Sequence, residues 1–330
     1  MMQQTDFGWI PPEQNPQYKK EQRKNLGYIG LGLCIYQVIM LVVSITMTEV
    51  CGRLFPTFFE SEAFNWLSEL PAYIIGLPVL YLFLRVMPKK APEKRALGGA
   101  NFVALLGGSL ALMMAGNILS MVLMSVIEEV RNDEISNAVD LMTQGQSPLY
   151  LLVFFVIVAP VCEELIFRKW IMDRLLPYSE TLAVVTSGLL FGLMHGNFYQ
   201  FFYATALGML FGVVYVKTGR LRHTIFLHAI LNLTGSMTSG FLAQVTAEDA
   251  AMTSSINPWI LVGGIYSTAL YTLMICGVIL LIRNRKEGTL CKTGDRFLTL
   301  GTQFKLAWSG GGTIAFCVLS GLSFFASLFI

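Results

Sequence analysis

The chain has little charge. Only 13% of its 330 residues are Asp, Glu, Lys or Arg, whereas 54% are hydrophobic. A soluble domain carries about a quarter charged residues, so this composition excludes an ordinary soluble globular protein. The formal net charge is only +2, and the basic residues fall between apolar runs, which is ordinary membrane topology and not a nucleic-acid-binding surface. The composition therefore predicts a membrane protein that has no nucleic-acid partner.

Several common catalytic and structural signatures are missing. The six cysteines are scattered and form no Cys-x-x-Cys pair, so we expect neither a disulfide framework nor a zinc ribbon. Gly-x-Ser-x-Gly, His-Glu-x-x-His and Gly-x-x-x-x-Gly-Lys-Ser/Thr do not occur, so serine hydrolases, zincins and P-loop enzymes lack support. The polar, proline-containing start of the chain is unlike a signal peptide, and we expect no cleavable one.

Long apolar runs recur instead. A helix needs roughly 20 apolar residues to cross about 30 Å of hydrocarbon. The runs predict an all-α, polytopic bundle of about eight or nine transmembrane helices. We expect a single domain over residues 27–330, with its functional core at about 148–245, after a polar cytoplasmic tail at 1–26. The expected spans are 27–49, 68–87, 102–127, 148–172, 180–197, 199–217, 223–245, 257–282 and 308–330.

The charges between the runs predict an orientation. Loops that carry Lys and Arg stay in the cytoplasm, whereas acidic or neutral loops cross to the other side. Basic clusters at 19–24, 89–95, 217–222 and 283–296 alternate with acidic or neutral loops at 50–66, 128–147 and 246–256. We therefore expect a multi-pass protein of the cell membrane whose N-terminus is cytoplasmic.

Two adjacent glutamates interrupt one of the apolar runs. An acidic side chain at the centre of a membrane helix costs on the order of 2.5–3.5 kcal/mol, so such a pair indicates a functional role. Glu164 and Arg168 are four residues apart and share a helix face, which predicts an ion pair. Glu163 lies about 100° further round the helix and has no such partner, so we take it as the candidate general base. The alternative is that both acids snorkel to the cytoplasm at a helix end, but the apolar residues 165–167 continue beyond them.

Two of the three histidines also lie in apolar segments. Taken alone, a histidine such as His195 is more often a hydrogen-bonded core residue than a catalytic group. His228 and Asn232 are four residues apart, so they share a face and could donate two hydrogen bonds to an oxyanion or form a polar clamp between helices. We expect His223, beside Arg222, to lie at the surface.

Two small-residue faces flank the histidine region. Gly188-x-x-x-Gly192 and Gly208-x-x-x-Gly212 have the spacing that lets membrane helices approach closely. Glycine is also simply common in membrane helices, but the position of both motifs favours a tightly packed site.

Three segments together resemble the motifs of a known family. Residues 163–168 read Glu-Glu-Leu-Ile-Phe-Arg, residues 191–195 read Phe-Gly-Leu-Met-His, and residues 228–232 read His-Ala-Ile-Leu-Asn. They are similar, in order, to the Glu-Glu-x-x-x-Arg, Phe-x-x-x-His and His-x-x-x-Asn/Asp motifs of the CPBP family. This family comprises the CAAX-protease and bacteriocin-processing intramembrane proteases, and the resemblance covers about 150–240.

The resemblance implies an endopeptidase that works inside the bilayer on a membrane-associated substrate, either a prenylated protein or a peptide precursor. It implies that Glu163 and His195 activate a water, that His228 and Asn232 stabilise the oxyanion, and that Glu164 and Arg168 orient the site. The family is often labelled a metalloprotease, but its chemistry has also been described as glutamate-dependent without a metal. If a zinc ion or another divalent metal is bound, Glu163, His195 and His228 are its candidate ligands. No His-x-x-x-His pair is present, and we expect a metal-free site.

Two other functions use the same residue types. Buried Glu and His are also components of transporters and proton relays, although the remaining spans are nearly free of charge. A non-catalytic scaffold or immunity member of the family is the third possibility, and the presence of all four polar positions argues against it.

The depths of these groups do not agree if each is counted from its nearest basic loop. His195 then lies about 20 Å deep, whereas Glu163 and His228 lie only about 8 Å deep. The mismatch disappears if the helix of His195 begins in the cytoplasm or tilts strongly. It shrinks if the glutamate segment continues as helix to about Leu175, which places Glu163 nearer mid-membrane, and we expect this second arrangement. His228 would then need a cytoplasmic extension of its own helix.

Overall fold

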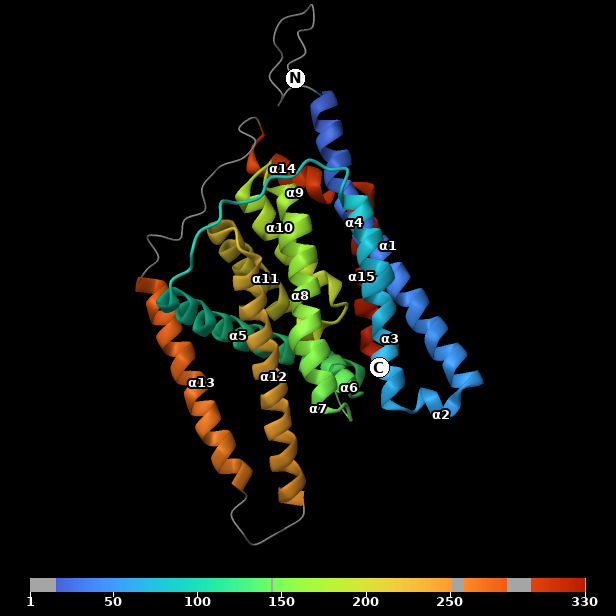
Figure 1. The fold of residues 1–330 in the computed structure, drawn as a ribbon, viewed down its shortest axis with the longest axis vertical. Coiled ribbons are helices and arrows are strands. Elements are labelled where there is room, and N and C mark those ends of the chain that lie inside the picture. Colours follow the sequence, from blue (N-terminus) through green and yellow to red (C-terminus); the bar gives the residue numbers. More distant parts are fainter. Residues whose placement is uncertain (1–15, 144, 251–257, 284–297, 330) are drawn as a thin grey trace, which may run out of the picture.

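The computed structural model describes residues 16–143, 145–250, 258–283 and 298–329 (Figure 1). These residues form a bundle of helices, as the composition predicted. The elements are α1 Pro16–Leu54, α2 Pro56–Phe59, α3 Glu62–Pro71, η1 Ala72–Gly76, α4 Leu77–Leu84, α5 Gly99–Arg131, α6 Ala138–Thr143, α7 Pro148–Tyr150, η2 Leu151–Val158, α8 Ala159–Glu164, η3 Leu165–Met172, α9 Asp173–Leu175, α10 Glu180–Met194, α11 Phe198–Thr218, α12 Leu221–Ala250, α13 Pro258–Arg283, α14 Leu300–Trp308, α15 Gly311–Ala326 and η5 Ser327–Phe329.

The predicted spans correspond to these helices. Among the described residues, 7 helical stretches are long and apolar enough to cross a membrane. The predicted spans at 180–197 and 223–245 correspond to α10, which is shorter, and to α12. The chain is therefore an all-α, multi-pass membrane protein.

The ends of several predicted segments differ. Helix α1 begins at Pro16, so residues 16–26 of the predicted tail belong to a helix, while residues 1–15 lie outside the described residues. The predicted acidic loop at 246–256 starts inside α12, and its residues 251–256 are outside the described part of the chain, as are residues 284–296 of the last basic cluster.

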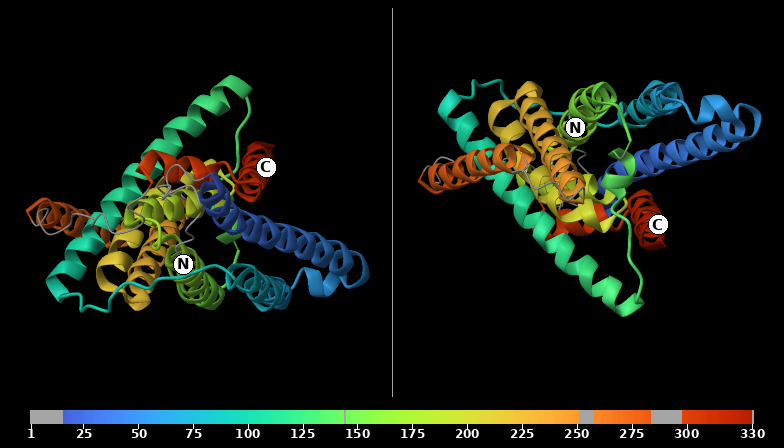
Figure 2. Two further views of the ribbon diagram at one scale, coloured as in Figure 1. Left: turned by 90° about the horizontal axis from the view of Figure 1, so that it is seen from above. Right: turned by 90° about the horizontal axis from the view of Figure 1, so that it is seen from below.

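The helices are arranged around α8, α10, α11 and α12 (Figure 1). On one side α13 packs against α5, which crosses the bundle obliquely and is seen at full length in Figure 2. On the other side α1 packs along α15 and α4. The candidate catalytic residues lie on, or directly after, these central helices.

Helices α10 and α11 touch through their glycines. A Cβ atom added at Gly208 would lie 3.0 Å from Gly188 Cα, and one added at Gly188 would lie 2.8 Å from Met209 N. A Cβ at Gly212 would be in ordinary contact, 3.4 Å from Val184 Cα. The predicted close approach is confirmed, because side chains larger than hydrogen at Gly188 and Gly208 would force the two helices apart.

An extended segment, residues 88–97, crosses one end of the bundle between α4 and α5 (Figure 1). Its Lys90 N–H donates to Asp173 O at 2.7 Å, and its Arg95 N–H donates to Thr218 O at 2.7 Å. Arg220 Nε donates to Arg95 O at 3.0 Å. These bonds fasten the segment over the end of α9 and over the turn between α11 and α12.

Candidate active site

The two glutamates end α8, in the middle of one continuous helical span, Pro148–Leu175. We call this span the glutamate helix. It has π-helical geometry on both sides of α8, in η2 and in η3. Such geometry is rare beyond a single turn and is frequent at functional sites, because it rotates the side chains away from their α-helical positions.

The glutamate helix reaches Leu175, as predicted. Twelve residues separate Glu163 from the end of its helix at Leu175, and fifteen separate His195 from the start of α10 at Glu180. The cytoplasmic extension expected for the helix of His228 is not present, because α12 begins at Leu221. The 88–97 segment is bonded to the turn before α12 through Thr218 O and Arg220 Nε.

Glu164 and Arg168 form the ion pair that their spacing predicted. Arg168 Nε lies 3.0 Å from Glu164 Oε2, and both side chains are 0% exposed. Three aromatic rings surround the guanidinium, whose carbon lies 5.0 Å from the centroid of Phe191, 5.7 Å from Phe211 and 6.0 Å from Phe167. Aromatic faces attract a desolvated cation, so this cage helps to hold a charge that burial would otherwise exclude.

His228 lies between the two glutamates. Its Nδ1 is 3.1 Å from Glu164 Oε1, within hydrogen-bonding distance, whereas its Nε2 is 3.6 Å from Glu163 Oε2, which is too long for a hydrogen bond. The side chain of Glu163 is 32% exposed and that of Glu164 is fully buried. The adjacent carboxylates therefore differ: Glu164 is held by a cation and an imidazole, and Glu163 remains accessible.

His195 directly follows α10 and faces the same region. Its Nδ1 lies 2.8 Å from Phe191 O and must donate to that carbonyl, so its Nε2 is left to accept a proton or to bind water. The Phe191 ring packs edge-on against His195, with centroids 4.9 Å apart, and against His228, at 5.8 Å. The Glu163 carboxylate is near enough to interact electrostatically with His195. The structure thus brings Glu163, His195 and His228 together.

Asn232 lies on the same face of α12 as His228, and its amide contacts the backbone. Asn232 Nδ2 donates to Phe155 O in η2 at 2.7 Å. Of the two roles that its spacing allowed, the structure shows a polar clamp between helices.

Two residues that the motifs did not single out also pack around the site. Thr224 is fully buried, lies four residues before His228 on α12, and its hydroxyl donates to Leu221 O at 2.9 Å. Ser187 of α10 donates to Phe167 O at 3.1 Å and accepts from Arg168 Nη1 at 3.5 Å. The spacing of four residues between Thr224 and His228 could have indicated the threonine, whereas nothing in the sequence marks Ser187.

The prediction for His223 was wrong. This residue is only 8% exposed, at the start of α12, where its backbone N–H donates to Arg220 O. An arginine next to a histidine was not enough to place the imidazole at the surface.

The residues present do not fit a metal centre. No group of three or more His, Cys, Asp or Glu side chains in the described ranges is arranged to hold a metal ion. Nδ1 of His195 lies on a backbone carbonyl and Nδ1 of His228 lies on Glu164, so these two contacts leave Nε2 of each ring open and do not themselves exclude a metal. The conditional zinc set of Glu163, His195 and His228 is nevertheless not among groups placed to hold a metal ion in the part of the chain that the structure describes.

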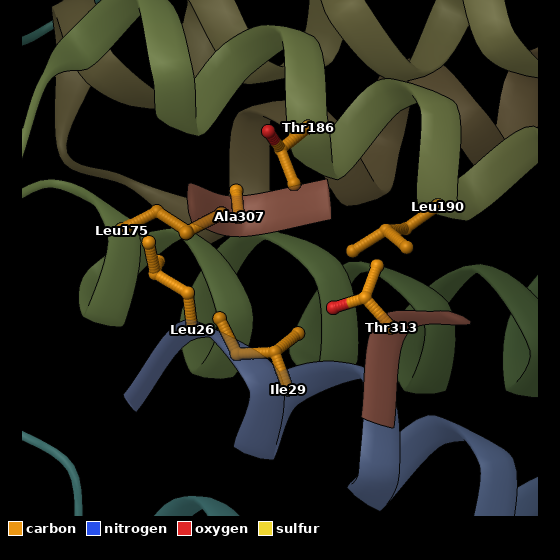
Figure 3. A pocket seen from close by; sticks show the side chains of 7 residues that line it. All are labelled: Leu26, Ile29, Leu175, Thr186, Leu190, Ala307 and Thr313. Atoms are coloured by element: carbon orange, nitrogen blue, oxygen red, sulfur yellow. The ribbon is translucent and has the colours of Figure 1, made fainter. Parts of the chain in front are cut away.

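A small apolar pocket lies elsewhere, between α1, α9, α10, α14 and α15 (Figure 3). It is lined by Leu26, Ile29, Leu175, Thr186, Leu190, Ala307 and Thr313. None of the candidate catalytic residues lines it, so this pocket is not the active site.

Comparisons with known proteins identify the same region. A family model described as "Type II CAAX prenyl endopeptidase Rce1-like" matches residues 145–234. A protein of Bacillus subtilis (strain 168) named "Putative membrane peptidase YdiL" is 32% identical over 167 residues, which are 49% of this chain and 66% of that protein. The chain thus spans slightly less than two thirds of the length of this relative. No solved structure matches the chain.

Both matches support a membrane protease. The matched range of the family model includes all three motifs, from Glu163 to Asn232. Neither description names a metal, so the assignment as a metalloprotease has no support from these relatives.

Proposed function

Because the chain belongs to the CPBP family of intramembrane proteases, we propose that it is an endopeptidase that hydrolyses a peptide bond of a membrane-associated substrate with a water activated by Glu163 and His195. The observation that carries the proposal is the difference between the two glutamates. Glu164 is paired with Arg168 and His228, whereas Glu163 is accessible and near enough to His195 to interact with it electrostatically.

The proposed first step is proton removal from water. A water held between the Glu163 carboxylate and His195 Nε2 gives its proton to Glu163 as its oxygen bonds to the carbonyl carbon of the substrate. Glu163 then delivers that proton to the leaving amine as the carbon–nitrogen bond breaks, so one water is consumed and a carboxyl group and an amine are released. A side chain in this role contributes typically 10²–10⁴-fold to the rate.

Two groups are proposed to stabilise the tetrahedral oxyanion. His228 is anchored through Nδ1 to Glu164, which leaves Nε2 outside hydrogen-bonding distance of Glu163 and free to donate to the substrate. Asn232 has a second amide proton besides the one that it donates to Phe155 O. Donors that are fixed before the reaction stabilise developing charge without being reorganised during it.

A proton relay is less well supported. The buried Asp, Glu, Lys and Arg side chains of the described residues all belong to the glutamate helix: Glu164, Arg168, Asp173 and Arg174. A relay across the membrane needs titratable groups along several helices. On other helices the catalytic candidates His195 and His228 gather at the same site as Glu163 and Glu164 and do not extend a path through the bundle.

The proposal includes a topology and a substrate class. We propose that the N-terminus is cytoplasmic, since the basic clusters all fall on one side of the predicted spans. The substrate is proposed to be a lipidated protein or a peptide precursor that reaches the site from the membrane.

Glu163→Gln tests the proposal, because it keeps the volume and removes the base. Purified protein in lipid nanodiscs is given one membrane-anchored reporter peptide in a prenylated and an unprenylated form. We expect the wild type to cleave at least one form and Glu163→Gln to be slower by about 10²–10⁴-fold. Cys162→Ala, on the same turn, is the matched control and should retain cleavage. Cleavage by Glu163→Gln at the wild-type rate would refute the assignment.

A further inference from the structure

Pro160 lies three residues before Glu163, at the junction of η2 and α8. A proline inside a helix has no N–H and leaves one carbonyl without its donor. In η2 the bonds reach five residues back, since Ala159 N–H donates to Phe154 O. The next bond in this pattern would run from residue 160 to Phe155 O, so Phe155 O is the carbonyl that Pro160 leaves without a donor.

Asn232 supplies the missing donor from another helix. Its Nδ2 lies 2.7 Å from Phe155 O. Within the hydrocarbon of a bilayer no water can replace a lost partner, and an unsatisfied carbonyl there is costly. The Asn232 amide therefore supplies a donor to Phe155 O, the carbonyl that Pro160 leaves without one.

The same face of α12 contacts the glutamate helix at a second point. Asn232 holds Phe155 on one side of α8, and His228 holds Glu164 at its end. Glu163 lies between these two contacts, immediately before Glu164. Its direction is therefore set by two side chains that are one turn apart on α12.

We propose that Asn232 is a positioning residue whose amide replaces the N–H that Pro160 lacks and so fixes the turn that presents Glu163 to the reacting water. This role is additional to the donation to an oxyanion, which would use the other amide proton. Its activity readout rests on the proposed protease function, whereas its stability readout does not.

The test restores the missing N–H. In Pro160→Ala, residue 160 can donate to Phe155 O by itself. We expect Asn232→Leu to lower the unfolding temperature by about 2–6 °C in the wild-type background and by less than half as much in the Pro160→Ala background. The kcat of Asn232→Leu should fall with little change in KM, and part of the lost kcat should return in the double variant. Pro160→Ser provides a second background with the same restored N–H.

Two controls match these variants. Ser236→Ala removes a hydroxyl of α12 that bonds to Asn232 O in its own helix, and its effect should be the same in both backgrounds. Asn232→Leu should cost as much in a Pro78→Ala background as in the wild type, because Pro78 lies on another helix, α4.

Equal losses of stability from Asn232→Leu in the wild-type and Pro160→Ala backgrounds would overturn the proposal. Recovered stability without any recovered kcat would also overturn it, since Asn232 would then be a clamp that does not position Glu163. If the wild type cleaves no reporter, the protease function fails on its own, and the unfolding temperatures still decide whether Asn232 replaces the N–H of Pro160.

Discussion

The glutamate helix carries two acid–base pairs of the same spacing, and they differ in how their charges are satisfied. Glu164 and Arg168 are both fully buried, 3.0 Å apart, and adjoin His228 and the accessible Glu163. Lys169 and Asp173 are 2.7 Å apart, but the lysine side chain is 43% exposed. Asp173 also accepts a hydrogen bond from Tyr215 at 2.8 Å, and its backbone carbonyl accepts one from Lys90.

This difference separates a reactive centre from an anchor. The second pair lies in the last turns of the helix, where Asp173 bonds to Lys169, to Tyr215 of α11 and, through its carbonyl, to Lys90. It thereby joins the helix to α11 and to the 88–97 segment. The first pair is enclosed by aromatic rings and directs an imidazole between two carboxylates. The same spacing of four residues therefore gives an ion pair in both cases. The two pairs differ in function because only the first adjoins an imidazole and an accessible carboxylate.

The largest expected effect is the loss of the buried cation. Arg168→Leu should destabilise the protein by about 3–5 kcal/mol, because it leaves the Glu164 carboxylate buried without its partner. Thermal unfolding in detergent measures the change. The control is the double variant Glu164→Leu/Arg168→Leu, which removes both charges and should be more stable than Arg168→Leu alone. A double variant that is less stable than Arg168→Leu would contradict this explanation, because removing the unpaired carboxylate should then have restored stability.

The next effect concerns rate and leaves stability unchanged. His195→Gln should slow cleavage of the reporter peptide by about 10²–10³-fold, because it removes the imidazole proposed to hold the attacking water. The unfolding temperature should shift little, because the amide of Gln can still donate to Phe191 O. Full activity in this variant would remove His195 from the mechanism.

A smaller effect is expected at the anchor. Tyr215→Phe removes the hydroxyl that donates to the buried Asp173 carboxylate, and a hydrogen bond to a charged group contributes about 1.5–3 kcal/mol. We expect a loss of stability in that range with kcat for the reporter unchanged. A clear fall in kcat, measured at a temperature where the variant is still folded, would mean that the anchor also acts on the active site.

The smallest effect is expected for the exposed member of the anchor. Lys169→Met should change the free energy of unfolding by at most about 1 kcal/mol, because its ammonium group is partly solvated and Asp173 keeps its other hydrogen bonds. The same unfolding measurement applies, with Arg168→Leu as the buried counterpart. A loss as large as that of Arg168→Leu would abolish the distinction between the two pairs.

The sequence predicted the features that depend on local spacing or on the thickness of the membrane. The spans follow from runs of about 20 apolar residues. The Glu164–Arg168 pair follows from a separation of four residues, and the separate character of Glu163 follows from its position on another face. The extension of the glutamate helix to Leu175 followed from the need to place Glu163 deeper in the membrane, nearer to the depth of His195.

Features that depend on contacts between distant segments could not be predicted in this way. The π-helical geometry on either side of α8 has no signature in an apolar run, and the partner of Asn232 is a backbone carbonyl 77 residues away. His223 is buried although Arg222 stands beside it, so its neighbour in the sequence was misleading. The cage around Arg168 draws its rings from three different helices, η3, α10 and α11.

The glycine contact between α10 and α11 determines which part of the site can adjust. Because the two backbones approach closely at Gly188 and Gly208, we expect α10 and α11 to move as one unit, and His195 directly follows α10. The distance between His195 and Glu163, the two groups proposed to hold the water, then depends on how the glutamate helix packs against this pair of helices. We therefore expect adjustments of the site to move the carboxylate more than the imidazole.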